Sequence, residues 1–239
     1  HTNNSGDQPE EDSMKMLTWG AALLFAASAT AVAQSLDDLK NDGNGKNAQN
    51  VLTYGMGYHQ NRYSPLKQIN KSTIKRLVPV WSASLNSTYG EQAQPLVYDG
   101  VLFATNAEAT VAIDITTGRQ LWRTPVNFDP ATPRVVCCGI SNKGAAIYNG
   151  KLYRLTLDAQ VRALDLKTGK QVWKQKSAEW KEGYSGINTP IIANGVLLTG
   201  MSGAEFGVRG FIQAFDANSG NALWKTYTVP APGEPGSES

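Results

Sequence analysis

The only two cysteines of this 239-residue chain, Cys137 and Cys138, are neighbours in the stretch RVVCCGISNKG. Adjacent Cα atoms lie about 3.8 Å apart, whereas a disulfide usually joins Cα atoms about 4.4–6.8 Å apart, so a bond between them would be strained. It would also close almost no loop and would hardly restrict the unfolded chain. The pair therefore leaves two interpretations open: buried free thiols, or a disulfide that does not act through stability.

A second residue whose side chain could take part in chemistry is Glu205, in the glycine-rich stretch SGAEFGVRG between two apolar runs. Carboxylate oxygens suit hard cations, and small neighbouring residues let the main chain approach a ligand closely. A single glutamate in such a turn is more often only a solvated loop residue. Taken alone, the stretch is therefore compatible with a metal ligand but does not establish one.

A repeat predicts the elements that hold these groups. The segments AIDITTGRQLW, ALDLKTGKQVW and AFDANSGNALW begin at Ala112, Ala163 and Ala214, 51 residues apart, and a weaker relative ends at Trp81. Each has an Asp-x-x-(Thr/Ser)-Gly turn before a tryptophan, and the glycine can adopt a positive φ. Because the tryptophan recurs in every copy, we interpret it as a wedge between repeats and not as a substrate platform.

Alternating apolar runs between the copies predict further strands. The runs PLVYDGVLFAT, AAIYNGKLYRLT and PIIANGVLLTG each contain an Asp-Gly or Asn-Gly dipeptide, which favours a tight hairpin turn. Two hairpins in each period of about 50 residues are typical of a propeller blade. The sequence thus predicts an all-β fold, a β-propeller of four-stranded antiparallel blades, with about four blades present.

The N-terminal region predicts export. The stretch MKMLTWGAALLFAASATAVAQS has a lysine, an apolar run and an Ala-Val-Ala site, which favours a signal peptide over residues 14–33. A transmembrane anchor is the alternative, but the run is shorter than the roughly 20 residues that span a bilayer. We treat 1–13 as upstream sequence, 34–53 as a lead-in and 54–239 as a partial propeller. The formal net charge of +2, with no basic run, gives no indication of nucleic-acid binding.

The repeat and the motifs GEQAQPLVYDG, CCGISNKGAAIYNGKL, SGAEFGVRGFIQAFD and PAPGEPGSES together resemble the quinoprotein alcohol dehydrogenases of the methanol and ethanol dehydrogenase family. The resemblance runs from about Tyr54 to Ser239. It implies an eight-bladed propeller that binds pyrroloquinoline quinone (PQQ) and a Ca²⁺ or lanthanide ion. It also implies that Cys137 and Cys138 form a disulfide ring that stacks on the quinone. Thiol-disulfide exchange is the rival role, but the spacing is not Cys-x-x-Cys.

The resemblance also implies roles for other residues. Ser202, Gly203 and Ala204 would contact the quinone, and Glu205 would bind the metal. Lys143 stands where an arginine that hydrogen-bonds the quinone carbonyls is usual; a lysine can polarise a carbonyl but lacks the forked donor set. Two further quinone contacts are expected at positions that depart from the family pattern. The expected glutamate is displaced by one residue, so Glu91 or Gln92 would make the first contact. Ile187 replaces an expected threonine, so Ser185 or Thr189 would make the second.

The implied reaction is oxidation of a small alcohol to an aldehyde, with hydride transfer to PQQ and electrons passing to a periplasmic acceptor such as a cytochrome c. The aspartate base would lie downstream, so no catalytic residue is assigned within these residues, and we expect an N-terminal fragment that is inactive alone. The alternative is a non-enzymatic propeller scaffold. The cysteine pair and SGAE argue against it, because a scaffold has no cofactor to hold.

Overall fold

The computed structural model describes residues 34–43, 47–136 and 139–238. They belong to one compact unit, Val32–Ser239. The predicted signal peptide and the cysteine pair lie outside the described residues. A short helix, α1 (Leu36–Lys40), starts at Ser35, whose side chain accepts from the Asp38 amide. None of the described helices is long and apolar enough to cross a bilayer.

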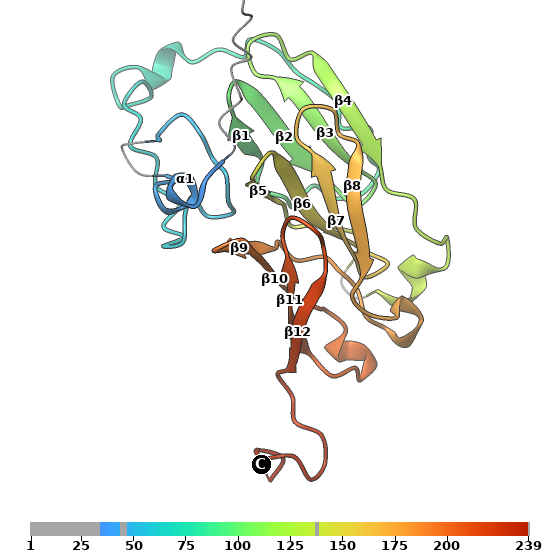
Figure 1. Cartoon of the computed structure of the whole chain (residues 1–239). Coiled ribbons are helices and arrows are strands. Elements are labelled where there is room, and N and C mark those ends of the chain that lie inside the picture. Colours follow the sequence, from blue (N-terminus) through green and yellow to red (C-terminus); the bar gives the residue numbers. More distant parts are fainter. Residues whose placement is uncertain (1–33, 44–46, 137–138, 239) are drawn as a thin grey trace, which may run out of the picture. The chain divides into compact units, whose positions relative to one another are not determined.

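Three four-stranded antiparallel sheets follow one another along the chain, each with its strands in sequence order (Figure 1). The first sheet contains β1 (Leu96–Tyr98), β2 (Val101–Thr105), β3 (Ala109–Asp114) and β4 (Gln120–Pro125). The second contains β5 (Ala146–Tyr148), β6 (Lys151–Thr156), β7 (Gln160–Asp165) and β8 (Gln171–Lys176). The third contains β9 (Ile191–Ala193), β10 (Val196–Gly200), β11 (Phe211–Asp216) and β12 (Ala222–Tyr227). Short 3₁₀ helices occupy Ile74–Arg76, Thr132–Val135, Trp180–Glu182 and Ala204–Phe206.

The predicted turns join the strands as expected. Asp99 and Gly100 both have positive φ, 48° and 74°, as the turn between β1 and β2 requires, and the two Asn-Gly turns match them. In the turn between β3 and β4, the Asp114 carboxylate accepts from the amide and the hydroxyl of Thr117 at 2.8 and 2.9 Å. The corresponding aspartates of the other two sheets make the same bonds to a threonine and a serine.

Each sheet is fastened to the next by a tryptophan. Trp122 of β4 donates its indole N–H to the Leu166 carbonyl of the second sheet at 3.3 Å, and Trp173 of β8 donates to the Ala217 carbonyl of the third at 3.2 Å. The rings lie on the turn glycines: a Cβ on Gly169 would be 2.5 Å from the Trp122 ring, and one on Gly220 would be 2.6 Å from Trp173. The structure confirms that these tryptophans are wedges between blades of a β-propeller.

The first and last tryptophan landmarks differ from the two central ones. Trp81 docks on the first sheet in the same way, with its N–H 2.8 Å from the Ile115 carbonyl, but the residues around it form no strand. The described residues therefore contain three complete blades and not about four, because Trp81 lies on a single segment without partner strands. Trp224 is 48% exposed, since no described sheet follows β12 to cover it.

The glycine beneath each ring gives a stability prediction. Gly220→Ala should destabilise the fold by about 1–3 kcal/mol more than Gly150→Ala, because overpacking a tight contact costs roughly this amount. Both glycines have a positive φ, 77° and 71°, but only a Cβ at 220 meets the Trp173 ring. Urea unfolding of the two variants measures the difference. Equal destabilisation would show that the ring moves aside without cost.

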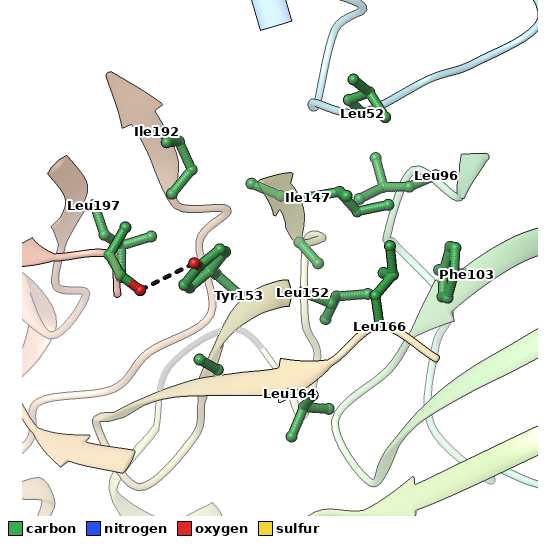
Figure 2. Packing of buried hydrophobic residues seen from close by; sticks show 14 of the residues in the cluster. Leu52, Leu96, Phe103, Ile147, Leu152, Tyr153, Leu164, Leu166, Ile192 and Leu197 are labelled. Atoms are coloured by element: carbon green, nitrogen blue, oxygen red, sulfur yellow. Dashed lines mark hydrogen bonds between the residues drawn. The ribbon is translucent and has the colours of Figure 1, made fainter. Parts of the chain in front are cut away.

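The N-terminal segment completes the core. Val51 pairs with Val97 of β1, the Leu52 carbonyl accepts from the Ile147 amide of β5 at 2.9 Å, and the Tyr58 hydroxyl donates to the Ile192 carbonyl of β9 at 2.7 Å. Figure 2 shows Leu52 in the cluster that also contains side chains of all three sheets. The segment therefore contacts the first strand of every blade.

Candidate quinone and metal site

The predicted site residues lie on connections at one end of the sheets. In a meander of four strands, the connection between the second and third strands and the connection to the next sheet leave from the end opposite the tight turns. Ser202–Glu205 follow β10, Lys143 precedes β5, Ser185 and Thr189 precede β9, and Glu91 and Gln92 precede β1. The Cys137–Cys138 pair belongs in sequence to the connection between β4 and β5 but lies outside the described residues.

Ser185 and Ser202 join two of these connections. Their backbones exchange two hydrogen bonds, of 2.9 and 3.0 Å, in an isolated antiparallel bridge. Ser185 is 1% exposed, whereas Ser202 is half-buried. The bridge therefore fixes the start of the SGAE stretch. Ser185 contributes to it through its backbone amide and carbonyl groups.

The chain turns sharply between Ser202 and Glu205. Gly203 has a φ of 139°, and a Cβ there would lie 2.3 Å from the Gly183 carbonyl oxygen, so only glycine fits. The 3₁₀ helix Ala204–Phe206 then presents Glu205 to solvent. Within the described part of the chain, the Glu205 carboxylate has no hydrogen bond or ion pair, so its oxygens are available to a ligand.

Lys143 and Thr189 lie at the same cavity. The Lys143 amide donates to the Ile187 carbonyl at 2.8 Å, and a Cβ on Gly144 would lie 2.9 Å from the Thr189 hydroxyl oxygen. A cavity of about 330 Å³ beside them is lined by residues of three segments: Thr53, Tyr54, Gly57, Tyr58, Gln60, Lys143, Asn188, Thr189, Pro190 and Ile191. Burial raises the pKa of Tyr58, whose hydroxyl donates to the Ile192 carbonyl at 2.7 Å. A cation, hydroxyls and amides thus share one concave surface.

Of the two candidates to replace the expected threonine, the structure places only Thr189 at this cavity. Ile187 is buried and packs with Ala107 and Leu157, so the position that carries the isoleucine belongs to the core. Near the first sheet, Glu91 accepts from the Asn106 side-chain amide at 3.1 Å. Gln92 is exposed beside it.

Sequence reasoning missed two asparagines. Asn142 is 1% exposed; its Oδ1 accepts from the Thr105 hydroxyl at 2.7 Å and from the Gly144 amide at 3.1 Å. Its Nδ2 donates to the Leu155 carbonyl at 3.1 Å. Asn188 lines the cavity. An asparagine in a loop usually signals a turn. Burial distinguishes Asn142 and the position at the cavity distinguishes Asn188, and sequence shows neither.

Glu205 is a candidate metal ligand, but the described residues do not place a complete ligand set around it. They include no group of three or more His, Cys, Asp or Glu side chains that could together hold a metal ion. Calcium takes six to eight oxygen ligands, so an ion bound by Glu205 would need further ligands from other residues or from a cofactor.

The match to a family model agrees with this fold. Residues 52–239 match the model described as glucose/ethanol/alcohol dehydrogenase, beta-propeller domain. The chain belongs to this family of PQQ-dependent alcohol dehydrogenases.

Individual relatives are similar over most of this chain. It is 41% identical over 214 residues to quinoprotein alcohol dehydrogenase PedH of Pseudomonas putida, covering 87% of this chain and 35% of that protein. It is 40% identical over 217 residues to 1-butanol dehydrogenase (quinone) of Thauera butanivorans, covering 85% and 34%. The chain thus spans about a third of the length of these relatives.

Two solved structures are similar in fold and in sequence. A europium-containing methanol dehydrogenase superposes with a TM-score of 0.75 at 32% identity, over 82% of this chain and 34% of that one. The quinohemoprotein alcohol dehydrogenase from Comamonas testosteroni gives 0.74 at 36% identity, over 78% and 28%.

Proposed function

We propose that the protein carrying this chain oxidises small alcohols to aldehydes with PQQ and a bound Ca²⁺ or lanthanide ion. The observation that supports the proposal is that Lys143 and Thr189 line one cavity and the Ser202–Glu205 stretch lies on a connection at the same end of the sheets, in a chain of this family. A scaffold would have no need of a free carboxylate and a cationic cavity at the same end.

The residues present suit the chemistry of this cofactor. PQQ is a flat anion with carbonyl and carboxylate oxygens, and the cavity offers the Lys143 ammonium group and the Thr189 hydroxyl as donors. Gly144 and Gly203 keep the backbone close to neighbouring loops at points where a Cβ would collide. The ring disulfide proposed for Cys137 and Cys138 would offer a rigid, apolar surface for one face of the quinone.

Each residue has a separate task in this proposal. When bound, the quinone would accept the hydride lost by the alcohol carbon, and the metal ion would act as a Lewis acid. Lys143 would bind and polarise quinone oxygens, and Thr189 would orient them by hydrogen bonding. Glu205 would hold the metal. Glu91 or Gln92 would contact the quinone at its edge, with Glu91 held by Asn106.

The proposal also includes a location and an electron acceptor. The signal-peptide pattern of residues 14–33 supports export to the periplasm, where an oxidising environment permits the disulfide. A soluble periplasmic acceptor such as a cytochrome c would then reoxidise the cofactor.

Reconstitution tests the function. Purified intact protein, treated with chelator and then supplied with PQQ and either Ca²⁺ or a lanthanide, should reduce an artificial dye in the presence of a short primary alcohol. Omitting PQQ or the metal should remove at least about 90% of this rate, because two-electron oxidation needs the quinone and its Lewis acid. Protein that binds no PQQ under these conditions would contradict the proposal and favour a scaffold.

A further inference from the structure

Arg154, on β6, is a buried cation without a carboxylate in contact. Its side chain is 1% exposed and crosses from the second sheet to the first. There Nη2 donates to the Asn106 carbonyl at 2.6 Å, and Nη1 donates to the Ala109 carbonyl at 2.7 Å and the Thr110 hydroxyl at 3.0 Å. Nε donates to the Leu155 carbonyl at 3.2 Å. The guanidinium therefore holds the connection between β2 and β3 against β6.

This arrangement is unfavourable for stability. Burial, and then the charge of Arg162, lower the pKa of Arg154 to about 9. Arg162 lies directly opposite on β7, and its Nε is buried without a partner. Like charges opposite each other in a sheet repel, and an unpaired buried donor is costly. Only Asp158, in the turn between the two strands, offsets the charge.

The other two blades show that the fold does not require this pair. The cross-strand pair at the same place is Ala104 with Val111 in the first sheet, and Thr199 with Gln213 in the third. A blade therefore forms with neutral residues at this cross-strand pair. The arginines of the second sheet need a reason other than packing.

Hydrogen bonds connect Arg154 to two predicted quinone contacts, to Glu91 through one residue and to Lys143 through three, the last being its neighbour in the chain. The carbonyl of Asn106 accepts from Arg154, and the side-chain amide of Asn106 donates to Glu91 at 3.1 Å. The Leu155 carbonyl accepts from both Arg154 and Asn142, whose Oδ1 in turn holds the Gly144 amide next to Lys143.

We propose that Arg154 is a positioning residue, which fixes Glu91 and Lys143 relative to each other across the two blades and so sets the affinity for the quinone. The inference rests on the proposed function for its ligand. It depends on the forked donor set and not on charge alone, because four bonds in different directions are made by one planar group.

Two arginine variants with a matched control test this role. Arg154→Met and Arg154→Lys should each weaken PQQ binding, measured by fluorescence titration, by about tenfold, which corresponds to roughly one net hydrogen bond. Arg162→Met removes a charge from the same face without touching Asn106 or Leu155, and it should change the affinity less than twofold. Rescue by lysine, or an equal loss in Arg162→Met, would show that charge and not positioning is responsible and would overturn the proposal.

Hydrogen exchange followed by mass spectrometry gives a readout without cofactor. In Arg154→Met, the amides of Ala109 and Gly144 should exchange faster, while those of β11 should not change. Unchanged protection at both places would overturn the role of Arg154 whether or not the protein binds PQQ. If the wild type binds no PQQ but the Arg154→Met variant shows the faster exchange, only the proposed function is contradicted.

A third variant keeps the test open should Arg154→Met not fold. Asn106→Asp retains the Oδ1 acceptor that the Glu108 and Ala109 amides use. It replaces the donor to Glu91 by a repelling oxygen, so the affinity for PQQ should again fall about tenfold. If the folded Asn106→Asp variant binds PQQ with wild-type affinity, the proposed connection from Arg154 through Asn106 to Glu91 is contradicted.

Discussion

Glu205→Gln is expected to raise the Ca²⁺ or lanthanide concentration needed for half-maximal alcohol oxidation by at least about 100-fold. Losing even an outer partner of a metal ligand costs about 10–100-fold, and Glu205 would be a ligand itself. The substitution keeps the size of the side chain and removes its charge. Because the carboxylate is exposed and has no partner in the described structure, the urea midpoint of the metal-free protein should not change.

Glu182 provides the matched control. It is an exposed glutamate in the 3₁₀ helix Trp180–Glu182, on the connection before β9 at the same end of the sheets. Glu182→Gln should leave the metal dependence within a factor of about two, since exposed charges are screened by salt and solvent. The same rise in both variants would indicate a general electrostatic effect and not a ligand at position 205.

Replacing Cys137 and Cys138 by serine is expected to weaken PQQ retention by at least about tenfold while leaving the unfolding midpoint of the cofactor-free protein unchanged. The first effect corresponds to losing a stacking surface worth roughly 1–3 kcal/mol per ring. The second follows because a bond between neighbours closes almost no loop. Thermal unfolding and PQQ titration, each performed before and after reduction of the wild type, measure both quantities.

Reduction of the wild type should reproduce the serine variant if the ring disulfide is the stacking surface. Reduction without effect on the quinone, with the serine variant still impaired, would indicate that thiols suffice. A large fall in the midpoint of the cofactor-free protein with unchanged quinone affinity would make the pair a structural bond and contradict the proposed role.

The sequence predicts the blades because their determinants are local. Asp-Gly and Asn-Gly turns, and the aspartate that caps its own turn, act within a few residues, and the structure shows each of them where expected. For Trp173, the sequence predicts only packing between repeats and not the contact with Gly220. Which residue it meets depends on the placement of whole sheets, which no local pattern specifies.

The roles of the candidate site residues stay predictions, and the structure adds their local geometry. The resemblance predicts a role for the SGAE stretch, and the structure adds that Gly203 is required by the approach of the Gly183 carbonyl. Residue type alone could not separate Ser185 from Thr189, since both are small hydroxyl residues in one loop. Arg154 gave no signal, because an arginine in an alternating strand is normally assigned to the solvent face.

The N-terminal segment changes how the three sheets can unfold. Repeats that contact only their neighbours can separate one at a time. Here the segment containing Val51, Leu52 and Tyr58 contacts the first strand of each sheet, and the bond from Tyr58 to Ile192 spans 134 residues. Opening the third sheet therefore also breaks contacts made by the start of the chain, which couples the sheets into one cooperative unit. This coupling also delays folding. During synthesis Tyr58 emerges long before β9, and its hydroxyl lacks the Ile192 carbonyl as a partner until the third sheet has formed.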